Sequence, residues 1–315
     1  MGKITHIKPE WFLKRQTKRR RRLPSAPLTN LLVLFRPTLV QLLVTSTLIF
    51  LWLRVFTALG VFNYFAASIL ALLLTYRSRW LWPLIKRTYD FIPFGSSQVQ
   101  LFYDPILGGS WRPSVAVEDC ERNLQDLSAK FSIHWRRRLL VYYFADAKDI
   151  SRIFGQHYGA TALTKFNALV IANGDHVQET IRHELTHLLA AKWNTNPPPL
   201  LTEGIATWLA GARRGQSIDS TAQAILLDAP PKLEYLLRQQ FFYSERNRSR
   251  CYTLAASFTG FLIRTYGWER YKKLYRHSYG IGFRLSFKQL IGVRFDTVEA
   301  QWREEIISGR WSKRE

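Results

Sequence analysis

Apolar and polar positions alternate with two different periods along the last two thirds of the chain. Residues 97–103 read SQVQLFY, an alternation that predicts a half-buried strand. Apolar residues recur at helical spacing over 115–131 and predict an amphipathic helix. Two β-rich apolar runs, 138–145 and 167–173, predict further strands, and a short helix is expected between them at 147–155. This mixture of strands and helices predicts the α+β fold class.

After these strands the pattern becomes helical. A helix is predicted over 175–193 and is followed by a Pro-rich break. Two more helices are predicted over 202–211 and 252–267, and each of them ends at a glycine. A last helix is expected from Asp296 onward. No internal repeat is visible, so residues 97–315 are predicted to form one domain.

The first third of the chain is apolar without either period. Residues 37–53 and 55–75 contain no charged side chain, and only Arg54 separates them. A helix of roughly 20 apolar residues spans a hydrocarbon core about 30 Å thick. We therefore expect a two-helix transmembrane hairpin at 31–76. The alternatives are a buried globular hairpin and a signal peptide, but a signal peptide would show a shorter apolar region and a small-residue cleavage site.

Charge is distributed unevenly in a chain with a formal net charge of +22. Residues 1–94 hold 15 Lys and Arg against 2 acids, which indicates a basic tail (1–30) and argues against a uniformly basic nucleic-acid-binding protein. Basic residues at both outer ends of the hairpin predict a multi-pass membrane protein with its C-terminal domain in the cytoplasm. The tail is expected to bind anionic lipid of the bilayer, with nucleic acid as the alternative, and 77–96 are expected to form an interfacial linker.

The candidate chemistry lies in residues 183–187, which read HELTH. On a helix His183 and His187 are about one turn apart, so both imidazoles project from the same face and can hold one metal ion. Glu184 lies about 100° around the helix and can act on water beside the metal without being a ligand. This arrangement is typical of hydrolysis by a zinc-activated water with Glu184 as the general base.

A third ligand is expected from Glu203, which opens the second helix in the stretch LLTEGIATW. Catalytic zinc sites often combine two His and one Glu with an open position. An acid at a helix N-terminus is also stabilised by the helix dipole, so Glu203 alone would not indicate a metal. Together with His183 and His187 it predicts one bound Zn²⁺. Gly204 removes a side chain and would let the two helices approach closely.

HELTH followed sixteen residues later by the Glu of LLTEGIATW resembles the gluzincin zinc metallopeptidases, and particularly their peptidase MA-like domains. The resemblance covers residues 97–310, and the spacing to Glu203 is nearer to that of the compact relatives than to that of the large gluzincins. It implies a zincin-like domain with a mixed sheet, and His183, His187 and Glu203 as ligands. It also implies that an extended substrate peptide adds to the edge of the sheet at 167–172.

Such enzymes usually stabilise the oxyanion with a Tyr or His outside the motif. Tyr252 is the first choice because it opens the downstream helix, and His157 and Tyr158 are the next candidates. Each of these side chains could instead be structural, because Tyr commonly buries its ring.

Three hypotheses follow, and the leading one is a membrane-anchored zinc metalloendopeptidase, a hydrolase of peptide bonds in proteins or peptides. The alternative is a non-catalytic peptidase-like adaptor or binding protein at the membrane. A DNA-associated protease would take a third His, and none follows His187 until His277, so nucleic acid is not an expected partner. Cys120 and Cys251 are too few and too far apart to indicate a disulfide framework.

Overall fold

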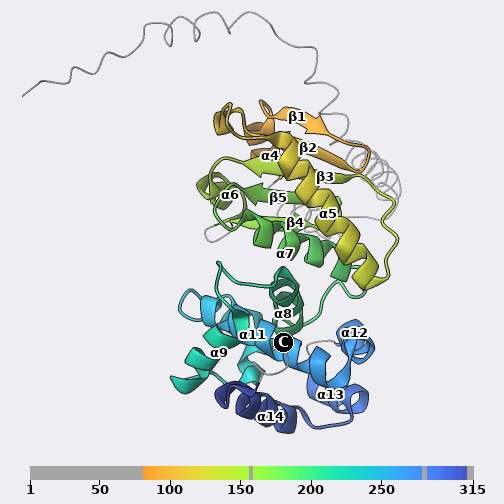
Figure 1. The fold of residues 1–315 in the computed structure, drawn as a ribbon, viewed down its shortest axis with the longest axis vertical. Coiled ribbons are helices and arrows are strands. Elements are labelled where there is room, and N and C mark those ends of the chain that lie inside the picture. Colours follow the sequence, from red (N-terminus) through yellow and green to blue (C-terminus); the bar gives the residue numbers. More distant parts are fainter. Residues whose placement is uncertain (1–80, 156–158, 279–281, 311–315) are drawn as a thin grey trace, which may run out of the picture. The chain divides into compact units, whose positions relative to one another are not determined.

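The computed structural model describes residues 81–155, 159–278 and 282–310 (Figure 1). The chain divides into two compact units, residues 1–82 and residues 83–315. The second unit contains every element described, apart from the first two residues of helix α4 (Leu81–Thr88).

A mixed five-stranded sheet forms one half of the second unit. Its strands are β1 (Ile92–Gly95), β2 (Val99–Tyr103), β3 (Leu139–Phe144), β4 (Ala160–Leu163) and β5 (Ala168–Ala172). Their spatial order is β1-β2-β3-β5-β4. β2, β3 and β5 run parallel, and β1 and β4 pair antiparallel at the two edges.

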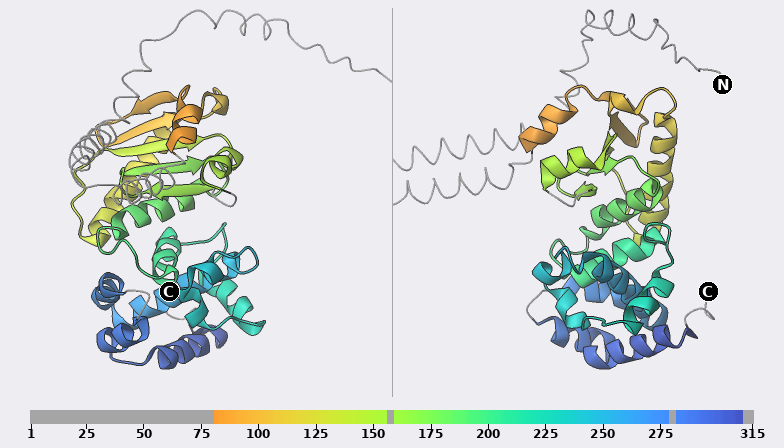
Figure 2. Two further views of the ribbon diagram at one scale, coloured as in Figure 1. Left: turned by 180° about the vertical axis from the view of Figure 1, so that it is seen from behind. Right: turned by 90° about the vertical axis from the view of Figure 1, so that its left-hand side faces the viewer.

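Helices cover both faces of this sheet, because its central strands are apolar on both faces. α5 (Pro113–Phe131) and α7 (Val177–Ala190) lie on one face, and α6 (Ala147–Phe154) lies on the other, as the right-hand view of Figure 2 shows. Leu139 and Val141 of β3 join the main core cluster on the side of α5 and α7. A continuous apolar run of this kind is typical of parallel strands buried on both faces.

The second half is helical and follows α7 in the sequence. It consists of α8 (Pro199–Ala210), α9 (Ile218–Leu227), the 3-10 turn η3 (Leu233–Leu237), α10 (Gln239–Phe242), α11 (Arg248–Tyr266), α12 (Trp268–His277), α13 (Phe283–Ile291) and α14 (Phe295–Ile307). A further 3-10 turn, η2 (Pro105–Leu107), follows β2. α8 packs against α7 and also against α11, which lies in the helical half (Figure 1), so α8 joins the two halves.

Gly204 allows the closest approach between α8 and α11. A Cβ atom at this position would lie 2.7 Å from the carbonyl oxygen of Ala255 and would also overlap Oγ1 of Thr259. Both obstacles belong to α11. The close approach expected from the sequence is therefore real, but it is made with α11 and not with α7.

The α+β class and the mixed sheet agree with the sequence analysis, although several boundaries differ. α8 begins at Pro199, because proline is well tolerated in the first turn of a helix. α11 begins at Arg248, four residues before the predicted start. Residues 77–96, expected to be a linker, contain α4 and the edge strand β1.

The predicted transmembrane hairpin requires a correction. A membrane-spanning helix needs a long and nearly uncharged apolar run. Within 81–155, 159–278 and 282–310 no helix meets both requirements. α5 and α11 reach 19 residues each, but charged side chains occur along both. The hairpin placed at 31–76 and the basic tail at 1–30 lie outside the described residues. We withdraw the hairpin from the fold class, and with it the multi-pass membrane localisation.

Candidate metal centre

α7 positions the two histidines by burying its opposite side. Ile181, Leu185 and Leu188 pack into the core, so the face carrying His183 and His187 turns toward a cavity. The Nε2 atoms of the two imidazoles lie 3.0 Å apart. The rings meet edge to face, with their centroids 4.7 Å apart. One helical turn therefore places two imidazole nitrogens at a single point, as the spacing predicts.

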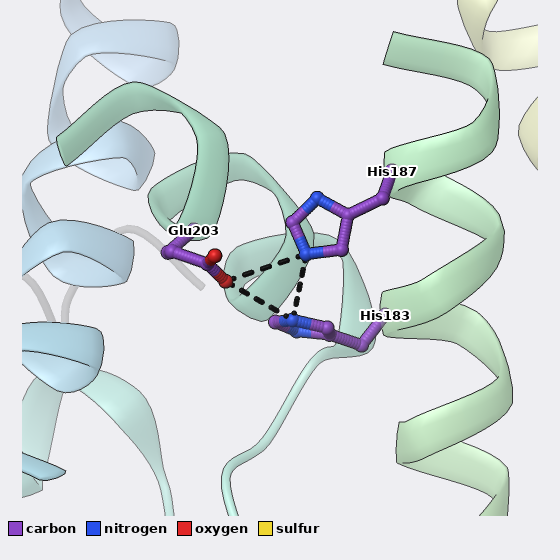
Figure 3. A group of neighbouring side chains, drawn as sticks. All are labelled: His183, His187 and Glu203. Carbon is purple, nitrogen blue, oxygen red and sulfur yellow. Dashed lines mark hydrogen bonds and ion pairs between the residues drawn. The ribbon is translucent and has the colours of Figure 1, made fainter. Parts of the chain in front are cut away.

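Glu203 reaches the same point from α8. Its Oε2 lies 3.3 Å from Nε2 of His183 and 3.3 Å from Nε2 of His187 (Figure 3). This oxygen is buried and has no well-formed hydrogen bond with the described residues. Its partner oxygen, Oε1, accepts a 2.6 Å hydrogen bond from the hydroxyl of Tyr243. Tyr243 thus fixes the carboxylate so that Oε2 faces the imidazoles.

The electrostatics of this group are those of a coupled acid and base. Burial opposes the charged form of His187, but the carboxylate of Glu203 raises the pKa of His187 to about 9. Burial alone would raise the pKa of Glu203, yet His187 and His183 lower it well below its ordinary value. Glu203 is therefore ionised here and supplies one negative charge to the cluster.

Glu184 lies beside this cluster and is almost fully buried. Burial raises its pKa, although His183 and His187 oppose the shift. A hydrogen bond with the backbone of Ala162 also favours the ionised carboxylate. This bond connects Glu184 to strand β4, and Glu184 is not one of the three residues whose donor atoms converge.

Two further side chains border the cluster. Oγ1 of Thr207, on α8, lies 3.5 Å from Nδ1 of His183. The ring of Tyr252, on α11, lies 6.0 Å from that of His183, measured between centroids. Its hydroxyl makes no hydrogen bond to the residues that the structure describes. Burial and the nearby carboxylate of Glu203 raise the pKa of Tyr252 well above its ordinary value, so the hydroxyl stays protonated.

All five residues proposed from the sequence meet in one cavity of about 880 Å³. They are His183, Glu184, His187, Glu203 and Tyr252. Glu203 belongs to the second turn of α8 and not to its first residue, because the helix begins at Pro199. The other two candidates for an oxyanion stabiliser, His157 and Tyr158, lie outside the described residues.

The sheet edge beside the cavity differs from the one expected. Residues 167–172 were predicted to be the edge, but β5 lies between β3 and β4 and is an inner strand. The edge is β4, whose residues 160–162 line the cavity. The amide of Ala172 donates to the carbonyl of Gly159. Along an antiparallel strand the backbone groups of successive residues point alternately toward the partner strand and away from it. Those of Ala160 and Ala162 therefore point away from β5.

Sequence reasoning missed Tyr243, Arg213 and Arg214 in the cavity wall. Tyr243 lies just after the short helix α10, in a stretch without a clear period, and no local signal indicates its contact with Glu203. The one available signal near Arg213 is Gly215, a residue typical of tight turns.

The donor atoms of His183, His187 and Glu203 all lie within 4.8 Å of one another, and this group could hold a metal ion. A scan against protein-family models finds no match, and a comparison with curated proteins finds no similar chain. The function must therefore be argued from the site itself.

Proposed function

We propose that the protein is a zinc-dependent peptidase that hydrolyses peptide bonds in proteins or peptides. The observation that carries the proposal is the convergence of two imidazole nitrogens and one ionised carboxylate oxygen, with a second buried carboxylate next to them. A cavity bordered by a sheet edge gives this group access to an extended chain.

The donor set supports zinc over the other common divalent ions. Calcium and magnesium prefer ligand sets made of oxygen, whereas mixed imidazole and carboxylate ligands suit zinc. Ligands about 2.05 Å from a zinc ion in tetrahedral arrangement are about 3.3 Å from one another. The three donor atoms here are separated by 3.0, 3.3 and 3.3 Å. Oε2 of Glu203, which is buried without a well-formed hydrogen bond to the described residues, would coordinate the metal.

Zinc held by these residues would supply Lewis acidity and would lower the pKa of water toward about 7. Glu184 would then accept the proton of the attacking water and pass it to the leaving amine, because its carboxylate lies beside the ligands without being one of them. Tyr243 would hold Glu203 in place through Oε1.

The protein also offers groups for the substrate. The outer edge of β4, at the backbone groups that are not bonded to Glu184, would bind an extended peptide as an additional strand. Tyr252 would donate its hydroxyl to the oxyanion, since the hydroxyl stays protonated and is not engaged by another described residue.

Metal content and peptide cleavage by the purified full-length chain test this proposal. We expect one zinc per chain, loss of zinc in His183→Ala, and cleavage of an unstructured protein such as casein. Glu184→Gln should keep the zinc and lose cleavage. Glu118→Gln is the matched control, because Glu118 is exposed on α5 and is not part of the cavity wall.

Three results would contradict the proposal in different ways. A chain without zinc after reconstitution would overturn the metal centre. Cleavage that survives Glu184→Gln would show that a contaminant or another site is responsible. Zinc binding without cleavage of any peptide would overturn the catalytic assignment and favour the non-catalytic binding protein.

A further inference from the structure

Three arginines form one wall of the cavity that contains the candidate metal centre. They are Arg213 and Arg214, which follow α8, and Arg248 at the start of α11. Arg213 and Arg248 are half-buried, and Arg214 is exposed. Among the described residues none of the three has a carboxylate as an ion-pair partner. The wall therefore carries three positive charges without a matching acid.

Arg213 is held in place although its charge is not paired. Its guanidinium lies over the ring of Tyr252, with 4.4 Å between Cζ and the ring centroid. Its Nε is buried and makes no hydrogen bond within the described part of the chain. The ring of Tyr252 in turn neighbours His183. The unpaired guanidinium therefore lies one aromatic ring away from a candidate metal ligand.

Arg248, like Arg213, has a buried Nε that makes no hydrogen bond to the described residues. One of its terminal nitrogens donates to the carbonyl of Tyr243 at 2.8 Å. Burial lowers the pKa of Arg213. The nearby charges of Arg214 and Arg248 lower it as well, and they outweigh the opposing effects of Tyr252 and Glu203 only together with burial.

A tight turn presents Arg213 and Arg214 to the cavity. The amide of Gln216 donates to the carbonyl of Arg213 at 3.0 Å, and both central residues, Arg214 and Gly215, have positive φ angles of 52° and 73°. These are the features of a type I′ turn. Glu179 of α7 accepts a 2.9 Å hydrogen bond from the amide of Gly215 and fixes the turn against the cavity.

The sequence of this turn is unfavourable for folding alone. A positive φ is costly for arginine, and Asn or Gly is preferred at such a position. Backbone strain of this kind concentrates at functional sites. A charged residue in a strained position beside two others of the same charge suggests a requirement beyond stability.

The acids of the cavity do not neutralise these arginines. Glu203 and Glu184 belong to the metal centre, and Glu179 is engaged by the turn and lies 3.5 Å from Nδ1 of His176. Asp175 is exposed at the rim, before the start of α7. The partner that this wall lacks is therefore an anion that enters the cavity.

We propose that Arg213, together with Arg214 and Arg248, binds a carboxylate of the substrate. The preferred substrates are then peptides that carry an acidic group near the bond presented to the metal centre. Planar guanidinium groups bind carboxylates through paired hydrogen bonds, which supplies both affinity and orientation. The carboxylate belongs either to an Asp or Glu side chain or to the C-terminus of the peptide. The identification of the ligand as a peptide rests on the proposed function, whereas the binding of the carboxylate does not.

The test measures binding without turnover, using full-length Glu184→Gln protein and fluorescence anisotropy. The probes are four ten-residue peptides of Ala, Gly and Ser with an N-terminal rhodamine. Two of them contain Asp at alternate positions and two contain Asn, and each pair has one free and one amidated C-terminus. We expect a carboxylate-bearing peptide to bind at least about tenfold more tightly than its neutral counterpart, because hydrogen bonds between charged groups are the strong ones. The Asp arm and the C-terminal arm separate the two sources of the carboxylate.

Variants then assign the preference to this wall. Arg213→Gln should reduce the preference to about twofold or less, and Arg214→Glu, at an exposed position, should reduce it as well. Arg136→Gln is the matched control: it removes the same charge from an exposed loop outside the cavity and should leave the preference unchanged. Near-ultraviolet circular dichroism confirms the fold of each variant, and Arg214→Glu keeps the test decisive if Arg213→Gln does not fold.

Equal binding of all four peptides would overturn the inference, and so would a preference that survives both Arg213→Gln and Arg214→Glu. Each measurement is repeated in EDTA. If the preference persists in EDTA and the wild-type protein neither binds zinc nor cleaves peptides, the proposed function is refuted and the carboxylate site is supported. Zinc-dependent cleavage without any preference for acidic peptides would do the reverse.

Discussion

Replacing Gly204 by alanine should destabilise the protein, although alanine is the better helix former. Gly204 lies inside α8, next to Glu203. A Cβ atom there would lie 2.7 Å from the carbonyl oxygen of Ala255 and would overlap Oγ1 of Thr259. The first obstacle is helix backbone and cannot rotate away. α8 must therefore move relative to α11 to make room.

The size of the effect follows from two opposing terms. Alanine gains about 1 kcal/mol over glycine inside a helix. Overpacking against a rigid neighbour costs about 3 kcal/mol. We expect Gly204→Ala to lower the free energy of unfolding by about 2 kcal/mol, which corresponds to a fall in Tm of roughly 4–8 °C. Urea and thermal unfolding followed by circular dichroism measure it. Because Glu203 moves with α8, zinc affinity measured by chelator competition should fall as well.

Two other glycines provide controls. A Cβ at Gly174 meets nothing within 4 Å, so Gly174→Ala should change the stability by no more than about 0.5 kcal/mol. Gly260 lies inside α11, but its obstacles are the side chains of Trp208 and Arg264 and not helix backbone. Gly260→Ala should therefore cost less than Gly204→Ala. A Gly204→Ala protein that is as stable as the wild type would refute the packing argument.

Three further predictions concern single groups. Tyr243→Phe removes the hydrogen bond to Oε1 of Glu203 and should weaken zinc binding by roughly 10- to 100-fold in chelator competition, whereas unchanged affinity would show that the bond does not orient the ligand. Burial raises the pKa of Cys120 and of Cys251 to about 12, so the folded state holds these protons more tightly than the unfolded chain. Their contribution to stability is complete below pH about 9 and is lost as the pH rises toward 12. Urea unfolding across this pH range measures the loss. Rapid reaction of either thiol with Ellman's reagent in the folded protein would contradict the burial on which this prediction rests. Arg214→Gly relieves a positive φ and should raise the free energy of unfolding by up to about 1 kcal/mol, while a loss of stability would show that the arginine side chain supports the turn.

The elements before the metal centre could be predicted because their signals are local. The helical period of apolar residues identified α5 within two residues of its observed start. The apolar runs of β3 and β5 also lay where expected. The pair His183 and His187 required only the geometry of one helical turn. Each of these inferences uses residues that are near neighbours in the sequence.

The order of the strands could not be predicted in the same way. β4 has four residues, all of them half-exposed, and its short apolar pattern resembles a loop. Without β4, residues 167–172 appeared to be the edge. One signal did argue against that assignment, because residues 168–171 are apolar without alternation and are buried on both faces. An edge strand beside an open cavity would more often alternate.

Glu203 shows how a boundary error changes the argument about a residue. The sequence placed it at a helix N-terminus, where the helix dipole alone would explain a carboxylate. α8 begins at Pro199, so Glu203 lies a turn further along, where the helix dipole contributes less. There Glu203 is buried: its Oε1 accepts a hydrogen bond from Tyr243, and its Oε2 faces two imidazoles. The structural alternative is weaker than it appeared, and the case for a ligand is stronger.

The location of the positive charges within the fold was the feature least predictable from the sequence. The sum of +22 and its excess in the first third suggested a basic tail and gave no indication of a cationic cavity wall. In the described helical half, Arg264 is paired with Asp219 and Glu305, and such pairs contribute to the packing of α9, α11 and α14. Arg213 has no such partner among the residues that the structure describes, and a half-buried charge without one costs stability. Its stacking on Tyr252 holds it in position but does not neutralise it. Folding alone therefore does not account for an arginine at position 213, and a ligand carboxylate does.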